Sequence, residues 1–328
     1  MARHRNGLAW MAVLAASVGA VSAVGGVAVA QDGGGERVTT PELELKFEVK
    51  PPRAPRDVNA PLPSLEEDGS AGNLLDHLER KDSELQRLRA DVSYTRVQAL
   101  AGDTQVRVGR MYYERGGALA DGGAARRFAI EFDALIVDRV ARDERTAWGF
   151  DGEWLVEKDY QTKQYVRRRI AKPGAEVDPL RLGNGGGAIP LPIGQRRDEV
   201  ERFFDAEMVG ALDGLVPDAD ALDDPDAGFR EFVRYMGGDA GVEGVYQLKL
   251  TPLEGTEAAE DYREMRLWYQ KGTLLPLMSR AIDRKRDIST VQLLNVDTEH
   301  AVDRGVIDIG PPPADTGWVV KEEDRLFE

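Results

Sequence analysis

The strongest constraint on the fold is an alternation of apolar and polar residues with a period of two. In RRFAIEFDAL, residues 126–135, Phe128, Ile130 and Phe132 fall on one face of a strand, and Arg127 and Glu131 fall on the other. Successive side chains of a strand point to opposite faces of a sheet, so this pattern predicts a strand with one buried face. Similar short segments recur between residues 91 and 313 with turn signals between them. We therefore expect an α+β protein that is mainly β, with an antiparallel sheet that curls or closes.

One of these segments raises a choice between a turn and an active site. In WGFDGEWLVEKD, the pair Asp151-Gly152 separates two alternating runs, which is a strong signal for a β-hairpin. Aromatic residues around acidic ones also occur in sites that cleave sugars, with Asp151, Glu153 and Asp159 as the candidates. The turn accounts for Asp151, and solvent-facing or loop positions account for the other two. We expect a hairpin, and keep a glycoside hydrolase as a minor alternative.

Three segments break the strand pattern. Leucines near helical spacing predict one amphipathic helix over Leu74–Leu88, with Asn73 as its N-cap. Residues 197–212 are also predicted to be helical, with Val200, Phe203, Phe204 and Met208 on one side. Residues 228–236 fit a helix or a strand. The stretch from about 176 to 241 is therefore expected to be a helical and acidic insertion.

The N-terminal residues resemble a signal peptide. Arg3 and Arg5 precede an apolar run from Leu8 to Val24, and Ala28-Val29-Ala30 fits a cleavage site. We expect residues 1–30 to direct export to the periplasm and to be removed. The alternative is a retained anchor in the inner membrane, because the run is close to the roughly 20 residues that span a bilayer.

The remainder divides into three parts. Residues 31–70 are rich in Pro, Gly and charge and are expected to be a disordered or extended linker. Residues 71–320 are expected to form one folded domain, followed by a C-terminal tail at 321–328. With no cysteine in the chain, that domain has no disulfide to stabilise it.

Composition argues against several classes of function. The net charge of −15 repels phosphate backbones, so we expect no nucleic-acid partner. Outside the signal segment the only histidines are His77 and His300, and the chain has neither a G-x-S-x-G motif nor a P-loop. We therefore expect no catalytic residues, no metal and no cofactor.

The predicted strands place a set of apolar side chains on one face of the sheet, which needs a cover. This set is Phe128, Ile130, Phe132, Trp148, Phe150, Leu248, Leu250, Met265, Leu267 and Tyr269. The predicted helices either cap an ordinary packed core or form a lid over a cavity for acyl chains. The pattern alone leaves both readings open.

The order of these segments resembles the LolA-like family of periplasmic lipoprotein carriers. The resemblance starts with the helix LLDHLERKDSELQRLRADV and continues through GRMYYER, RRFAIEF and the DGEWLVEKD hairpin. It extends into YQLKLTP, MRLWYQKGTLLPLMSRAID and DISTVQLLNVD, so it covers residues 74 to 320. No single motif is specific to this family, but the set of segments in this order is.

The resemblance implies an incomplete β-barrel whose cavity holds the acyl chains of an outer-membrane lipoprotein or a lipid. It also implies a monomer that receives cargo from an inner-membrane donor and delivers it to an outer-membrane acceptor. In this family an arginine after the first turn helps to hold the lid closed, and Arg115 matches it. The expected lid residues are Leu74, Leu78, Leu85, Arg115, Phe203 and Phe204. Related folds sense envelope stress, so the alternative is an interaction protein with a packed core and no cargo.

Overall fold

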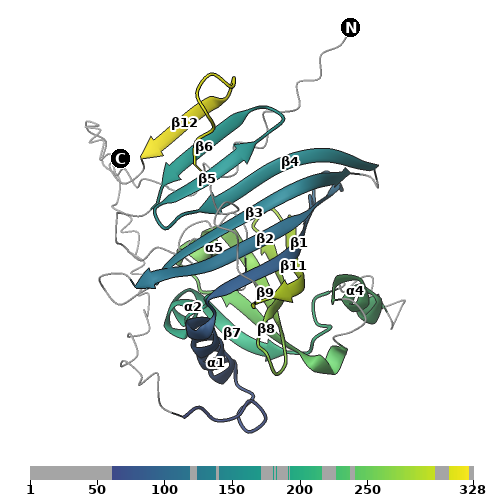
Figure 1. The fold of residues 1–328 in the computed structure, drawn as a ribbon. Coiled ribbons are helices and arrows are strands. Elements are labelled where there is room, and N and C mark those ends of the chain that lie inside the picture. The colour runs from purple at the N-terminus through teal and green to yellow at the C-terminus, as the bar shows by residue number, and fades with distance from the viewer. Residues whose placement is uncertain are drawn as a thin grey trace, which may run out of the picture. The chain divides into compact units, whose positions relative to one another are not determined.

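Within the residues that the computed structural model describes, twelve strands form one continuous sheet (Figure 1). The described residues are 61–118, 124–137, 140–170, 180, 182, 191, 193–215, 227–236, 241–299 and 310–324. The strands are β1 (Arg87–Val97), β2 (Thr104–Ala118), β3 (Ala124–Val137), β4 (Val140–Phe150), β5 (Trp154–Asp159), β6 (Gln164–Arg169), β7 (Phe204–Val209), β8 (Val245–Pro252), β9 (Tyr262–Gln270), β10 (Pro276–Asp283), β11 (Ile288–Asp297) and β12 (Val319–Asp324). The helices are α1 (Ala71–Glu84), α2 (Arg197–Phe203), α4 (Ala227–Met236) and α5 (Glu257–Asp261), with a 3₁₀ turn η1 at Val242–Gly244.

The sheet is open, because its two outermost strands are different ones. The order is β12-β6-β5-β4-β3-β2-β1-β11-β10-β9-β8-β7, and Figure 1 shows it curling without closing. The prediction of a mainly β, half-open barrel with helices is therefore confirmed. Ten of the strand pairs are antiparallel, as predicted, and β12 alone among the described strands runs parallel to its neighbour, β6. Residues 321–324, expected in a tail, belong to β12.

The first helix starts and ends earlier than the leucine spacing predicted. Its N-cap is Ser70, whose side chain accepts a hydrogen bond from the Asn73 backbone N–H. Asn73 instead lies buried and donates its side-chain amide to the carbonyls of Pro63 and Asp68, at 3.2 and 2.7 Å. The helix ends at Glu84, and Leu88 already lies in β1. Pairing of β1 with β2 has overridden the helical pattern at this end.

The segment 197–212 was predicted as one helix, and this was wrong beyond Phe203. After α2 the chain enters β7, where Phe204, Ala206 and Met208 share a face and pair with β8. Apolar residues at these positions fit a period of two as well as a helical turn. The unpaired edge of β8 decides between them, because it offers backbone hydrogen bonds to an extended chain.

Register joins the two halves of the sheet into one apolar face. Residues directly opposite each other lie on the same side, and pairing links Leu248, Leu267, Ser279, Val291 and Tyr94 in one row. We call this side the inner face. Helices α1, α2 and α5 supply apolar side chains to it, which agrees with the expected position of the first helix.

The opposite, outer face of β8 to β11 is also covered. Trp268 donates its ring N–H to the carbonyl of Ala211 at 2.9 Å, and Arg280 donates to the carbonyl of Gly214 at 2.7 Å. Gln292 donates to the carbonyl of Tyr235 in α4 at 2.7 Å. The region predicted as an insertion therefore contributes to both faces of the sheet: α2 to the inner one, and residues 211–215 and α4 to the outer one.

The Asp151-Gly152 turn is confirmed as a hairpin between β4 and β5. The Asp151 carboxylate accepts hydrogen bonds from the backbone N–H groups of Glu153 and Trp154, at 2.9 and 2.8 Å. Gly152 has a φ of +105°, a conformation that other residues rarely adopt. The turn thus accounts for Asp151, one of the three carboxylates considered for a hydrolase site.

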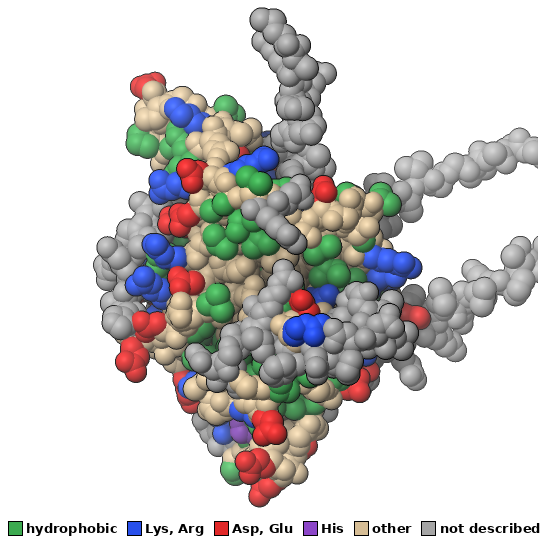
Figure 2. All heavy atoms as spheres, turned by 90° about the vertical axis from the view of Figure 1, so that its right-hand side faces the viewer, with side chains coloured by type: hydrophobic (Ala, Val, Ile, Leu, Met, Phe, Trp, Pro, Cys, Tyr) green, Lys and Arg blue, Asp and Glu red, His purple; other side chains and the backbone are tan. Residues whose placement is uncertain are grey.

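Several predictions concern residues outside the described part of the chain. These are the signal peptide at 1–30, the linker up to residue 60, parts of the insertion at about 176–241, and residues 300–309 of the expected domain, among them His300. Residues 61–70, the end of the predicted linker, are described and contain a turn at 65–67. In the described part, no helix is both long and apolar enough to cross a membrane. Figure 2 shows acidic and basic side chains interspersed on one face of the molecule.

The register of β2 and β3 shifts beside Gly109, where β3 carries one extra residue, Asp133, and this site gives a test of the fold. A Cβ at this position would lie 1.8 Å from the carbonyl oxygen of Glu131 on β3. We expect Gly109→Ala to lower the free energy of unfolding by at least about 1–3 kcal/mol, measured by urea denaturation. Gly210→Ala is the matched control, because a Cβ there meets no atom within 4 Å. Equal stability of the two variants would contradict the close approach of β2 and β3.

Candidate functional site

The ten apolar residues singled out in the sequence all lie on the inner face, in two adjoining clusters. Phe128, Ile130, Phe132 and Phe150 belong to a cluster built on β1 to β4 and β11, with Trp148 packed against it. The other five belong to a cluster built on β8 to β10: Leu248, Leu250, Met265, Leu267 and Tyr269. The sheet thus brings together residues that are more than 100 positions apart in the chain.

These side chains are shielded from water. Ile130, Phe132 and Leu267 are fully buried, and Trp148 is partly buried. The Trp148 ring meets that of Phe132 edge to face, with the centroids 5.4 Å apart. The cover over the first cluster includes Leu180, Leu191 and Ile193. An apolar face of this size is stabilised only where something keeps it dry.

The expected lid residues divide between the cover and the sheet. Leu74 and Leu78 of α1 are buried in the second cluster, and Leu85 packs against the first. Phe203, at the end of α2, is partly buried against the second cluster. Phe204 is a residue of β7, so it belongs to the sheet and not to the cover, because the predicted helix ends before it.

A charged contact joins the end of α1 to the sheet. Arg115 on β2 and Arg126 on β3 lie directly opposite each other, and Asp82 of α1 accepts from both, at 2.9 and 2.5 Å. Arg115 also donates to the backbone carbonyl of Ser83 at 3.1 Å. The three charged side chains are 7–15% exposed. We call Asp82, Arg115 and Arg126 the latch.

Two buried tyrosines lie near the latch. Burial raises the pKa of Tyr113 above its ordinary value and the charge of Asp82 raises it further, while the two arginines lower it. Burial also raises the pKa of Tyr269, again with a contribution from Asp82. Both phenols therefore stay protonated and neutral at physiological pH. The Tyr269 hydroxyl has no hydrogen-bond partner among the described residues.

A second contact joins α1 to α2. Arg197 donates to Asp76 at 2.6 Å and to Glu201 at 2.8 Å. The described residues between 180 and 195 are held by one buried amide, since Gln195 donates to the carbonyls of Leu180, Leu191 and Ile193 at 3.1–3.2 Å. The cover is therefore a set of short pieces joined by polar contacts.

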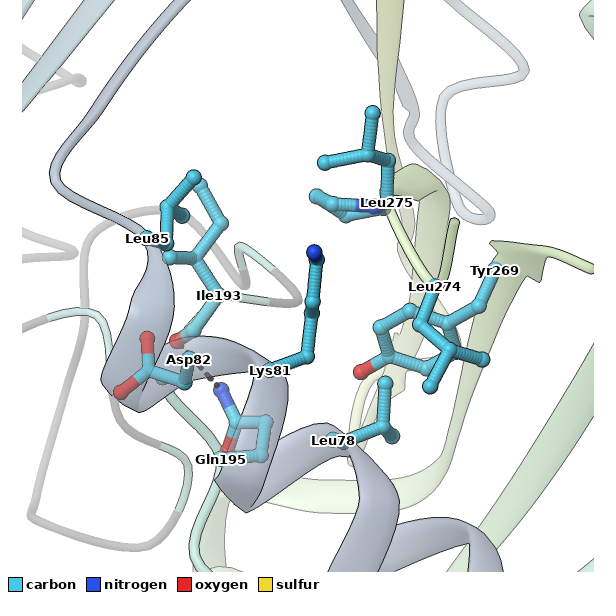
Figure 3. Close-up of a pocket in the computed structure, with 11 residues that line it drawn as sticks. Leu78, Lys81, Asp82, Leu85, Ile193, Gln195, Tyr269, Leu274 and Leu275 are labelled. Atoms are coloured by element: carbon cyan, nitrogen blue, oxygen red, sulfur yellow. Dashed lines mark hydrogen bonds between the residues drawn. The ribbon is translucent and has the colours of Figure 1, made fainter. Parts of the chain in front are cut away.

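A small cavity of about 30 Å³ lies where α1 ends, large enough for roughly one water molecule. Figure 3 shows Lys81 standing between Leu85 and Ile193 on one side and Leu274 and Tyr269 on the other. A cleft of about 480 Å³ shares Lys81, Leu85 and Leu275 with this cavity. The rest of the cleft is lined by Glu84, Gln86, Arg87, Gly272, Thr273, Thr298 and Glu299.

Sequence reasoning placed Arg115 in the lid contact but missed its partners. Asp82 stands in a run of charged residues, RKDSE, that is typical of a solvated helix face. Arg126 did carry a signal, because it shares the face of Phe128 and Ile130 and so extends an apolar stripe with a charge. A charge at that position implies an opposite charge from another element. In the described part of the chain, no group of three or more His, Cys, Asp or Glu residues is arranged to hold a metal ion.

No family model and no curated protein matches the chain. Among solved structures, an uncharacterized conserved protein from Thermus thermophilus is 15% identical, over 76% of this chain and 99% of that one, with a TM-score of 0.38. A putative outer membrane lipoprotein-sorting protein domain from Vibrio parahaemolyticus is 9% identical over 73% and 96%, with a TM-score of 0.31. A LolA superfamily protein from Nitrosomonas europaea is 8% identical over 71% and 96%, with a TM-score of 0.27. LolA-like proteins, the family that the sequence resembles, are thus among the solved structures to which this chain is similar.

The latch can be tested by removing its one carboxylate. Asp82→Asn leaves two neighbouring arginines, both largely buried, without their shared counter-charge, so we expect a loss of about 3 kcal/mol in the free energy of unfolding. Glu84→Gln is the control, because its ion pair with Lys81 is exposed and worth less than about 1 kcal/mol. Both are measured by urea denaturation. The latch would be refuted if Asp82→Asn cost no more than the control.

Proposed function

We propose that this protein binds a long-chain hydrophobic ligand, the acyl chains of a lipoprotein or of a lipid, against the inner face of its sheet. One observation carries the proposal: a continuous apolar face is covered by short segments, which apolar packing and polar contacts together hold beside a cleft. A cover that ends in a charged latch fits a part that opens and closes.

The energetics of an acyl chain agree with this purpose. Each methylene moved from water into an apolar site is worth about 0.8 kcal/mol, so a long chain in water costs on the order of 10 kcal/mol. A carrier needs a dry apolar surface for such a chain and no reacting group. We accordingly propose a binding protein rather than an enzyme, with neither a metal nor a cofactor.

The cleft beside α1 supports a route of entry. Its volume of about 480 Å³ lies within the range of small-molecule sites. The adjoining cavity holds only about 30 Å³, so the passage of an acyl chain requires the end of α1 to move away from β9 and β10. The Tyr269 hydroxyl lines this cavity and is free to donate to the ester carbonyl of an entering ligand.

We further propose that the protein works after export, as a monomer that takes cargo from an inner-membrane donor and passes it to an outer-membrane acceptor. The pattern of residues 1–30, which lies outside the described part of the chain, supports export.

A second candidate function is an envelope interaction protein that carries no cargo. The observation that favours it is the complete burial of Ile130, Phe132 and Leu267, which an ordinary packed core also gives. Native mass spectrometry of the exported protein separates the two. A carrier retains copurifying acylated species, whereas an interaction protein with a filled interior has the mass of its chain alone.

A charge on the inner face tests ligand binding. Ile130→Glu places a carboxylate at a fully buried apolar position, so we expect the Kd for a fluorescent fatty acid to rise at least tenfold. Asp151→Asn is the control and should leave the Kd unchanged, because the asparagine oxygen still caps the turn. Circular dichroism checks that each variant is folded. Absence of binding by folded wild-type protein would instead favour the interaction protein.

Weakening the latch tests whether an acyl chain enters beside the end of α1. Arg115→Leu removes the contacts to Asp82 and Ser83 and leaves Arg126 in place, so we expect the fatty acid probe to transfer to lipid vesicles severalfold faster. The natural chain has no cysteine, so spin labels at Glu84→Cys and Asp133→Cys report the distance from α1 to the sheet. That distance should lengthen when the probe is added. A constant distance together with an unchanged transfer rate would rule out opening at α1.

A further inference from the structure

The edge of the sheet formed by β6 carries a strand that differs from the others. β12 is parallel to β6, with Val319 opposite Gln164 and Asp324 opposite Arg169. β6 is its single neighbour in the sheet, so β12 is an edge strand held along one side. In Figure 1 β12 lies at one end of the sheet, away from α1.

Two ion pairs follow the register of this contact. Arg167 is opposite Glu322 and donates to it at 2.9 Å through Nε, and Arg168 is opposite Glu323 and donates to it at 2.9 Å. Arg168 and the nearby Lys321 lower the pKa of Glu323, with the hydrogen bond from Lys321 as the largest cause. Consecutive arginines on β6 thus match consecutive carboxylates on β12.

An aromatic side chain adds an anchor at the start of the strand. Trp318 packs against Val156 and Tyr165, and its ring meets that of Tyr160 edge to face with the centroids 5.4 Å apart. Lys163 holds the same end, because its ammonium donates to the carbonyl of Thr316 at 3.0 Å and its own carbonyl accepts from the Val319 N–H at 2.9 Å.

The described side chains of β12 remain accessible. None of residues 319–323 is buried, and Val319 and Val320 are 65% and 52% exposed. The strand therefore owes its position to main-chain pairing, the ion pairs and Trp318, and contributes none of these described side chains to a core. These are the contacts by which proteins bind an added peptide strand at a sheet edge.

We propose that the edge of β6 is a binding site for an extended acidic peptide segment of a partner protein, which the chain's own β12 occupies in its absence. The partner segment runs parallel to β6. It places an aromatic residue against Tyr160 and two consecutive carboxylates, four and five residues later, against Arg167 and Arg168. This site is separate from the inner face, so the proposal of a peptide site does not depend on the proposal of ligand binding.

The test uses the full chain and a fluorescent peptide with the sequence of residues 314–324. In the double variant Glu322→Lys, Glu323→Lys the resident strand loses its ion pairs, so we expect this chain to bind the peptide at least tenfold more tightly than wild type, measured by anisotropy. Glu66→Lys, Glu67→Lys is the control for the change in net charge and should behave as wild type. Hydrogen exchange should show that protection at β6 is regained when the peptide binds.

Charge reversal at the edge gives the complementary result. The full chain with Arg167→Glu and Arg168→Glu should not bind the acidic peptide, but should bind a peptide with lysines in place of the two glutamates. A peptide with alanine in place of Trp318 should bind at least tenfold more weakly to the chain that carries Glu322→Lys and Glu323→Lys. The proposal is overturned if the chain with Glu322→Lys and Glu323→Lys binds a scrambled peptide as tightly as the peptide of residues 314–324. It is also overturned if this chain binds neither peptide. Sedimentation that shows a stable wild-type dimer with exchanged β12 strands would also overturn it, since the occupant is then a second copy.

Discussion

Two arginines lie face to face on neighbouring strands, and the carboxylate that compensates them comes from a helix. Arg115 and Arg126 are paired by the register of β2 and β3, and like charges at such positions repel. Asp82 removes this repulsion only when the end of α1 lies over these strands. The contact therefore holds the end of α1 over β2 and β3, beside the cleft that Lys81 lines.

An open sheet must also protect two faces and two edges with a limited length of chain. The stretch between β6 and β8 does much of this work, because it passes from the cover of the inner face, through α2 and the edge strand β7, to the outer face at residues 211–215. At the other edge β12 covers β6. Long unpaired edges invite pairing with other chains, and both ends of this sheet carry short strands of six residues.

How far the sequence predicts this structure depends on the range of the interaction. Alternation of Phe128, Ile130 and Phe132 predicted a strand face correctly, because the period of a strand is local. Phe204 was misplaced in a helix, since its pairing partner on the edge of β8 is Pro252, which is distant in the sequence. Asp82 read as a solvated charge for the same reason: its partners are 33 and 44 residues away. Residues 321–324 were expected in a tail, and they form a strand because β6, distant in the sequence, offers main-chain pairing together with Arg167 and Arg168.

A charged latch has different consequences from an apolar one. When an apolar contact opens, the full hydrophobic free energy is lost, because nothing in water replaces it. When an ion pair opens, each charge regains hydration, and that gain offsets most of the attraction that is lost. Asp82 and its arginines thus define the closed position of α1 closely while adding less to the free energy of closing than the buried leucines of α1. The leucines of α1 then determine how strongly the closed state is favoured over the open one. A ligand that replaces their contacts with its own chain shifts the equilibrium towards the open state.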